Sequence, residues 1–154
     1  AQGRFNTFEQ KADVGSVQVT VWLPPGYERD TRRRYPVLYM HDGQNVFDPK
    51  RSNFNKVWAA DQAALRLIRE RKVAPFLIVA VDHPGATRFL RYFPSRVASG
   101  PLRQGIEGFA RGRLGGDDYL SFLADTLKPA IDQRYRTRPQ ARFTATAGAS
   151  MGGL

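Results

Sequence analysis

The chain has 154 residues, of which 42% are apolar and 12% aromatic, a composition that predicts a folded domain and excludes an intrinsically disordered chain. The absence of cysteine excludes disulfides and thiolate metal sites. The formal charge of +10, carried mainly by arginine, could attract an anionic partner, but no zinc-finger, RNP or helix-turn-helix pattern accompanies the arginines, so we predict no nucleic-acid partner.

The sequence leaves the cellular compartment open. No apolar run approaches the roughly eighteen residues of a membrane-spanning helix, so we predict no membrane partner. Residues 1–4 lack the apolar region of a secretory signal, but a chain whose signal had been removed would look the same. Cytoplasmic and periplasmic or secreted locations are therefore both compatible with the sequence.

Three segments in the first half of the chain have strand patterns. Residues 16–23 alternate apolar and polar side chains with a period of two, which predicts a half-buried, antiparallel strand. Residues 37–40 and 76–81 are unbroken apolar runs, which are typical of strands buried on both faces of a parallel sheet. A fourth short strand is predicted over residues 142–147.

Two segments have the apolar spacing of helices, residues 57–72 and 119–131. Pro129 should kink or loosen the last turn of the second helix. Asp117 and Asp118 precede that helix and could form an acid/base couple, but the stabilising effect of carboxylates in the first turn of a helix is a sufficient explanation for them.

Residues 84–116 show no clear period, which favours a lid, a binding loop or short unrecognised helices. Together these elements predict one α/β domain over residues 1–154, with a mainly parallel sheet and helices on both faces.

The segment Gly148-Ala149-Ser150-Met151-Gly152 follows the last predicted strand directly. Gly-x-Ser-x-Gly after a strand is the pattern of a nucleophile elbow, in which the glycines allow close backbone approach around an exposed serine. Ser150 is therefore the candidate nucleophile. The alternative interpretation is an ordinary strand-to-helix turn without catalytic meaning.

Four motifs give the chain a family resemblance from about residue 14 to the end. They are Val-Trp-Leu-Pro-Pro-Gly-Tyr at 21–27, Tyr-Pro-Val-Leu-Tyr-Met-His-Asp-Gly-Gln-Asn-Val-Phe-Asp at 35–48, Leu-Lys-Pro-Ala-Ile-Asp at 127–132, and the elbow at 148–154. The sequence resembles the putative-esterase family, the branch of the α/β-hydrolases that includes esterase D, enterochelin esterase and feruloyl esterase.

This resemblance implies a serine carboxylesterase that acts on a small-molecule ester without a metal or organic cofactor. It assigns Ser150 as the nucleophile, the backbone N–H of Met151 as one oxyanion donor and Gln44 as the second. It also implies that the strand at 76–81 lies beside both the strand at 17–23 and the strand at 37–40. The strand at 142–147 should then pair with the strand at 37–40.

The resemblance also predicts that the chain is the N-terminal half of an incomplete α/β-hydrolase fold. The triad order in this fold is serine, then aspartate or glutamate, then histidine, and neither later member follows Ser150 here. We therefore expect the acid and the histidine from a missing or separate C-terminal segment, with that segment or a second copy covering the last strand. The alternative is a truncated, non-catalytic binding or assembly module.

Three features of the sequence limit the family interpretation. His41 and His83 each follow a strand that should end near the elbow, but neither motif contains the Asp-His-Ser arrangement of a catalytic base, so we disfavour both. Arg91 stands where relatives commonly carry glutamate in an Arg-x-x-Glu-Tyr segment, which leaves substrate binding open. Ala149 stands where the family often has serine, a change we expect to be neutral.

Overall fold

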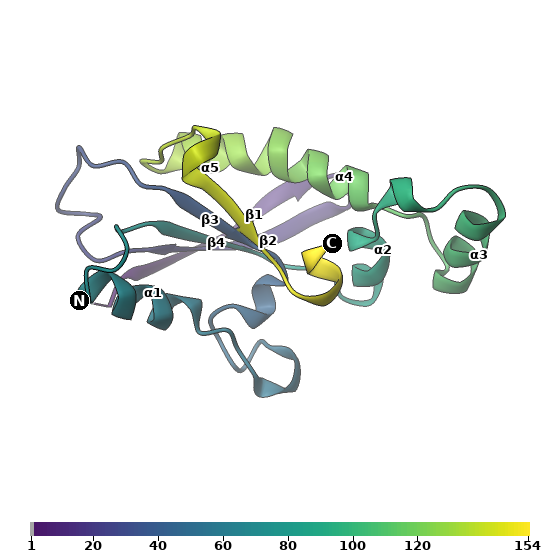
Figure 1. Ribbon diagram of the computed structural model, residues 1–154, viewed down its shortest axis with the longest axis horizontal. Helices are drawn as coiled ribbons and strands as arrows, with labels where there is room; N and C mark the ends of the chain where they lie inside the picture. Colours follow the sequence, from purple (N-terminus) through teal and green to yellow (C-terminus); the bar gives the residue numbers. More distant parts are fainter. Residues whose placement is uncertain (1) are drawn as a thin grey trace.

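Five strands form one mixed sheet in the order β1-β2-β4-β3-β5 in the computed structural model, which describes residues 2–154 (Figure 1). The strands are β1 (Arg4–Ala12), β2 (Gly15–Leu23), β3 (Val37–Met40), β4 (Leu77–Val81) and β5 (Thr144–Ala147). β4 lies between β2 and β3, and β5 pairs with β3, which confirms both predicted neighbour relations. The architecture is that of an incomplete α/β-hydrolase sheet.

The strand directions confirm the predicted antiparallel strand at residues 16–23, and the sheet as a whole is mixed rather than mainly parallel. β3 is parallel to β4 and to β5, whereas β2 is antiparallel to β1 and to β4. The β1–β2 pair is a hairpin with a two-residue connection, Asp13 and Val14, and such a tight connection requires antiparallel strands. The sheet is therefore mixed because a hairpin precedes its parallel part.

β1 lies before Ser16, where the sequence pattern predicts no strand. β1 occupies one edge of the sheet, where its side chains alternate between exposed and half-buried. Most of its residues are polar, and an edge strand needs only a few apolar contacts, so the apolar signal is weak. Its pairing with β2 runs over the whole strand, from Arg4 opposite Leu23 to Ala12 opposite Gly15.

Both predicted helices are present with shifted ends. The first is α1 (Ala60–Arg69). The second is one continuous rod of α4 (Gly116–Ser121), a π-helical segment (Phe122–Leu127) and α5 (Lys128–Arg134). The π-helical turns end just before Pro129, which cannot donate the backbone hydrogen bond of a regular helix.

The aperiodic segment between residues 84 and 116 contains two short helices. They are α2 (Arg88–Tyr92), which packs against α4, and α3 (Gly100–Ala110), whose side chains are exposed or half-buried. Asp117 and Asp118 lie in the first turn of α4, which agrees with the structural interpretation of this acidic pair.

Helices cover both faces of the sheet, as predicted (Figure 1). On one face α1 packs over Trp22, Ile78 and Ala80. On the other face the rod from α4 to α5 packs over the alternate side chains of β2, β3 and β4, including Val21 and Val79. Within the described residues, no helix is long and apolar enough to cross a membrane.

Candidate active site

Ser150 lies on a tight turn immediately after β5 and has a positive φ of 55°, an uncommon backbone conformation for a residue with a side chain. The residue is exposed, and the chain continues from it into a 3₁₀ turn, Ser150–Gly153. Strain in this region of φ and ψ is characteristic of functional turns. The local geometry therefore agrees with the predicted elbow.

The elbow glycines are required by close backbone packing. A Cβ atom on Gly148 would lie 1.8 Å from the carbonyl oxygen of Gly152 and 2.9 Å from the ring of His41. A Cβ atom on Gly152 would lie 3.1 Å from the carboxylate of Asp42. The elbow therefore folds directly against the turn that follows β3.

That turn joins the elbow because β3 and β5 are adjacent and parallel. The backbone N–H of His41 donates to the carbonyl of Ala147 at 3.1 Å, which extends the β3–β5 ladder by one hydrogen bond. Residues at the carboxyl ends of neighbouring parallel strands meet at one edge of the sheet, the usual location of ligand sites in such folds. His41 and Ser150 are brought to this edge by different strands.

An ion pair holds the turn after β3 in an unusual conformation. Asp42 has a φ of 55° and is 5% exposed. Arg88 binds both of its carboxylate oxygens, with N–O distances of 2.5 and 2.7 Å, and the backbone N–H of Asp42 donates to the hydroxyl of Tyr92 at 3.1 Å. The paired guanidinium stabilises the buried carboxylate. Arg88 of α2 therefore holds Asp42 in this backbone conformation and fixes the start of the turn that contains Gln44.

His41 lies in an aromatic pocket beside this ion pair. Its Nδ1 atom shares a hydrogen bond of 2.6 Å with the hydroxyl of Tyr119, and its ring packs at a steep angle to the rings of Tyr92 and Tyr119. Burial lowers the pKa of His41, although the charge of Asp42 acts in the opposite direction. Burial also raises the pKa of both tyrosines, so the whole pocket favours neutral side chains.

Gln44 and His83 clamp two neighbouring strand ends together. The Gln44 side chain donates to the backbone carbonyl of His83 at 2.8 Å and accepts from its backbone N–H at 3.0 Å. The Gln44 amide group is thus occupied, whereas its backbone N–H makes no hydrogen bond within residues 2–154. The backbone N–H of Met151 is likewise without an acceptor in the described chain.

Neither histidine is arranged as part of a triad in the described residues. The Nδ1 atom of His83 accepts from the backbone N–H of Gly85 at 2.9 Å, and that of His41 is bonded to Tyr119. Ser150 has no side-chain hydrogen bond to either ring within residues 2–154. No carboxylate is hydrogen-bonded to either ring within that range.

Arg91, which replaces the expected glutamate, has a partner outside the site. It binds both carboxylate oxygens of Asp13 in the β1–β2 turn, at 2.7 and 2.8 Å, and its side chain is only 4% exposed. Its guanidinium also lies over the rings of Tyr119 and Phe122. Arg91 therefore links the β1–β2 hairpin to α4, the helix whose Tyr119 contacts His41.

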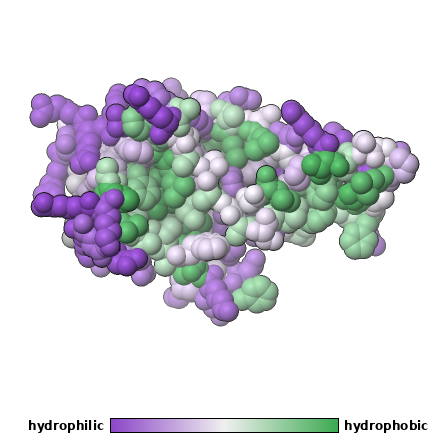
Figure 2. Space-filling model, viewed as in Figure 1, coloured by the Kyte–Doolittle hydropathy of each residue, from purple (hydrophilic) through white to green (hydrophobic). Residues whose placement is uncertain are grey.

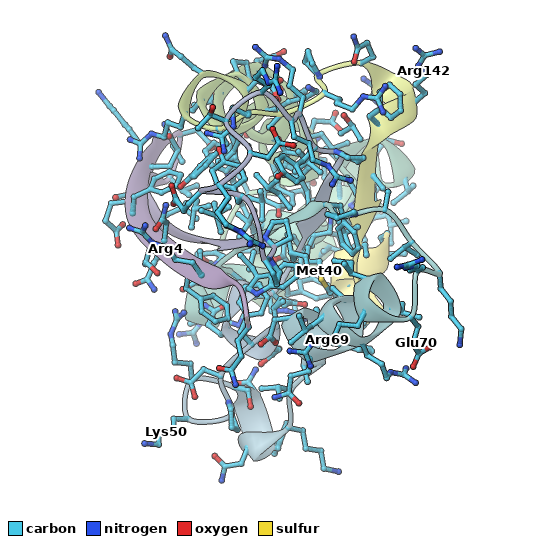
Figure 3. The ribbon with its side chains drawn as sticks, turned by 90° about the vertical axis from the view of Figure 1, so that its left-hand side faces the viewer. Arg4, Met40, Lys50, Arg69, Glu70 and Arg142 are labelled. Carbon is cyan, nitrogen blue, oxygen red and sulfur yellow. The ribbon has the colours of Figure 1, made fainter. Side chains whose placement is uncertain are left out.

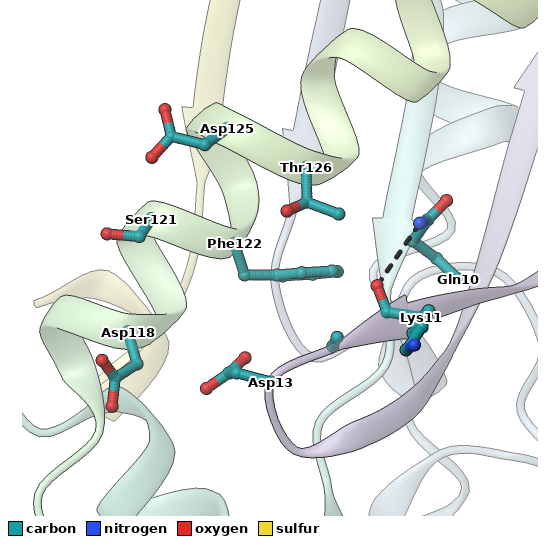
Figure 4. A pocket seen from close by; sticks show the side chains of 9 residues that line it. Gln10, Lys11, Asp13, Asp118, Ser121, Phe122, Asp125 and Thr126 are labelled. Atoms are coloured by element: carbon teal, nitrogen blue, oxygen red, sulfur yellow. Dashed lines mark hydrogen bonds between the residues drawn. The ribbon is translucent and has the colours of Figure 1, made fainter.

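A separate hollow of about 560 Å³ lies between this hairpin and the helical rod (Figure 4). Asp118 and Asp125 project from the rod and Asp13 from the hairpin, and Phe122 of the rod also lines the hollow. The described residues contain no cluster of three or more His, Asp or Glu side chains that could hold a metal ion. This hollow contains none of the residues predicted for the site.

Most of the residues that support the site are not predictable from local sequence patterns. Asp42 and Arg88 are 46 positions apart, and Tyr92 and Tyr119 lie in separate helices. Asp42 belongs to the quoted motif at 35–48, which could have marked it. The tyrosines carry no local signal, because only the packing of α2 against α4 brings them to His41.

A comparison with protein families matches the one described as "Putative esterase" over residues 14–154, and the chain belongs to this family. The structure is similar to that of an IroE-like serine hydrolase from Shewanella oneidensis, with a TM-score of 0.71, 19% identity, and coverage of 97% of this chain and 43% of that one. It also resembles the siderophore hydrolase EstA from Aspergillus nidulans, with a TM-score of 0.70, 18% identity, and coverage of 99% and 50%. At these identities the similarity establishes the α/β-hydrolase-like fold.

Two curated relatives are longer than this chain. One is an endo-1,4-beta-xylanase/feruloyl esterase from Xylanibacter ruminicola, 27% identical over 145 residues, which cover 92% of this chain and 17% of the relative. The other is the uncharacterized protein YbbA from Bacillus subtilis, 25% identical over 146 residues, which cover 95% and 50%. The chain therefore spans at most half the length of these relatives.

Proposed function

We propose that this chain carries the nucleophile and the oxyanion hole of a serine carboxylesterase. Family membership supports a carboxylic ester hydrolase, and the positive φ of Ser150 directly after β5 is the observation on which the nucleophile assignment depends. Ser150 attacks the ester carbonyl while a base takes its proton, and the tetrahedral intermediate expels the alcohol, which receives that proton. Water then hydrolyses the acyl group from Ser150, which releases the carboxylic acid and regenerates the serine.

The oxyanion of that intermediate is stabilised by two backbone donors. We assign these to Met151, which follows the nucleophile in the elbow, and to Gln44, which lies in the turn packed against it. Both N–H groups are free of internal acceptors in the described chain, as a preorganised oxyanion hole requires. The Gln44 side chain has a different role, because its two hydrogen bonds to His83 hold the donor in place.

The general base and its acid partner come from polypeptide outside these 154 residues. His41 and His83 are hydrogen-bonded to other groups, and neither pairs with both a carboxylate and Ser150 in the described chain. The substrate class is a small-molecule carboxylic ester, and no step in this scheme requires a cofactor.

Hydrolysis of p-nitrophenyl acetate by the chain alone tests the donor assignment. We expect slow turnover, because an oxyanion hole without its histidine retains roughly 10³ to 10⁴ over water while losing about 10⁶ in kcat. Ser150→Ala should leave this remnant largely unchanged, because a serine without its base contributes little and the remnant comes from the oxyanion donors. A parent chain that is no faster than buffer would overturn the oxyanion-hole assignment and favour a non-catalytic module.

A second measurement tests the origin of the base. Efficient, Ser150-dependent turnover by a preparation free of any other polypeptide would show that a histidine of this chain acts as the base. His41→Asn and His83→Asn would then identify which one. Labelling of Ser150 by a fluorophosphonate probe only when a C-terminal segment is present is the result that we expect.

A further inference from the structure

The arginines at the two ends of the parallel strands differ in how many of them form ion pairs. At the carboxyl ends, near Ser150, Arg51, Arg88 and Arg91 each form an ion pair with an aspartate. At the opposite end, seven arginines lie in the two segments that lead into β3 and β5, and we call this region the basic end. Its arginines are Arg29, Arg32, Arg33, Arg34, Arg136, Arg138 and Arg142.

The two segments of the basic end are bound side by side. Tyr35 donates its backbone N–H to the carbonyl of Arg136 at 2.9 Å and accepts from the N–H of Arg138 at 2.8 Å. Arg34 reaches the carbonyl of Thr137 at 3.3 Å. The figures agree, since Figure 2 shows hydrophilic side chains gathered at this end and Figure 3, which faces it, shows Arg142 projecting outward.

No arginine of the basic end forms an ion pair with a carboxylate within residues 2–154. Six of the seven are exposed, and Arg136 is half-buried. Two carboxylates belong to the same segments: Glu28 pairs with Arg4, and Asp30 accepts the backbone N–H groups of Arg32 and Arg33. Their two negative charges offset only part of the charge of seven arginines. The positive charge of this end is therefore not neutralised from within the chain.

Several of these guanidinium groups are held in place by aromatic rings. Arg136 stacks on Tyr27 at 3.9 Å, while Arg138 and Arg142 lie over Phe143 at 3.5 and 4.8 Å. Stacking orders the guanidinium but leaves N–H groups at its edge able to bind an anion. An open polar hollow of about 530 Å³ lies in the same end, and its charged lining residues are Arg29, Arg32, Arg33 and Asp30. That volume is within the range of ligand pockets.

We propose that the basic end binds an acidic polysaccharide through its carboxylate groups. Guanidinium groups bind carboxylates through paired hydrogen bonds, and an extended chain of charged sugars presents several at once. The segments 24–36 and 134–143 expose no large apolar side chain for insertion into a membrane. Tyr27 and Tyr35 are buried and Phe143 is covered by arginine, so these three rings offer no stacking surface to single-stranded nucleic acid.

Affinity electrophoresis in gels containing polygalacturonate, a carboxylated polysaccharide, tests this proposal directly. We expect retardation that weakens as NaCl rises from about 0.05 M to about 0.5 M, since salt screens exposed charges. The triple variant Arg32→Gln, Arg33→Gln, Arg34→Gln should bind about tenfold more weakly. The matched control Lys50→Gln, Arg111→Gln, Arg113→Gln removes the same charge from other exposed positions and should bind like the parent chain.

The other segment of the basic end provides a second test if the triple variant does not fold, as judged by circular dichroism. Arg138→Gln combined with Arg142→Gln should also weaken retardation, and Ser150→Ala should not change it, which separates this proposal from the ester chemistry. Equal losses in the basic-end and control variants would overturn the proposal. Tighter binding to duplex DNA or to vesicles of anionic phospholipid than to polygalacturonate would overturn it as well.

Discussion

His41 makes the stability of this chain depend on pH. Burial lowers its pKa below the ordinary 6.5, so the unfolded chain takes up a proton near that pH while the folded chain does not. The free energy of unfolding should therefore decrease as the pH falls below 6.5, until the folded-state pKa is reached. His41→Asn keeps a polar partner for Tyr119 without an imidazole, and urea unfolding at about pH 7.5 and about pH 5 should show a smaller decrease.

The pKa of His83 is also lowered by burial, but this residue is present in both chains and its contribution cancels in the comparison. An identical pH dependence in the parent chain and in His41→Asn would contradict the prediction. Circular dichroism at each pH verifies that both proteins start from the folded state.

Gly148 is the residue of the elbow with the least space for a side chain. Gly148→Ala would place a methyl group 1.8 Å from the carbonyl oxygen of Gly152, so the turn must open. We expect a loss of stability of about 1 to 3 kcal/mol and the loss of the slow ester hydrolysis that the oxyanion hole supports. Gly105→Ala is the matched control, because no atom lies within 4 Å of its added Cβ, and urea unfolding should show no loss of stability.

At the scale of elements, one ion pair joins the β1–β2 hairpin to α2. The side chain of Arg91 is 4% exposed and that of Asp13 is 39% exposed, so the two partners differ in what their removal leaves behind. Asp13→Ala leaves a buried, unpaired guanidinium and should cost about 3 to 5 kcal/mol. Arg91→Met leaves a carboxylate that water can reach, so we expect a clearly smaller loss in urea unfolding. Equal losses would show that burial does not determine the energetics of this pair.

The same pair has a signature at acidic pH. Its hydrogen bonds with Arg91 lower the pKa of Asp13 below 3.8 in the folded chain. The resulting stability is fully present above pH 3.8 and is lost as the pH falls through the folded-state pKa. This contribution should be absent from Arg91→Met, which a comparison of the acid unfolding curves of the two proteins can verify.

At the scale of the whole molecule, β5 leaves one edge of the sheet open. Ala145 and Thr146 are exposed, and an apolar hollow of about 310 Å³ lined by Tyr39, Leu120 and Leu123 lies beside the strand. Exposed strand edges pair with other strands. We therefore expect the isolated chain to self-associate in light scattering, and a stable monomer of 17.3 kDa would contradict this.

Thr146→Lys should reduce the self-association, because a charged side chain on an edge strand disfavours pairing. Thr7→Lys is the matched control on β1, the opposite edge, where an exposed threonine also occupies a strand. If both variants behave alike, the β5 edge is not the interface.

The order of the strands could be predicted because the strongest apolar patterns belong to its centre. β4 is fully buried, so its unbroken apolar run identified it, and the family motifs then placed it between β2 and β3. β1 could not be predicted, because a polar edge strand gains its stability from pairing with β2 over nine residues. The π-helical segment was not anticipated either, although Pro129 indicated an irregularity nearby.

Local sequence determined the elements that need only neighbouring residues: the buried strands, the amphipathic helices and the glycines around Ser150. Tertiary structure alone decided which side chains surround the turn after β3, because Arg88, Tyr92 and Tyr119 reach Asp42 and His41 only when α2 packs against α4. It also decided that Arg91 pairs with Asp13, 78 positions away. Ion pairs and hydrogen bonds between distant segments depend on how the helices pack on the sheet, and no local pattern of residues encodes that packing.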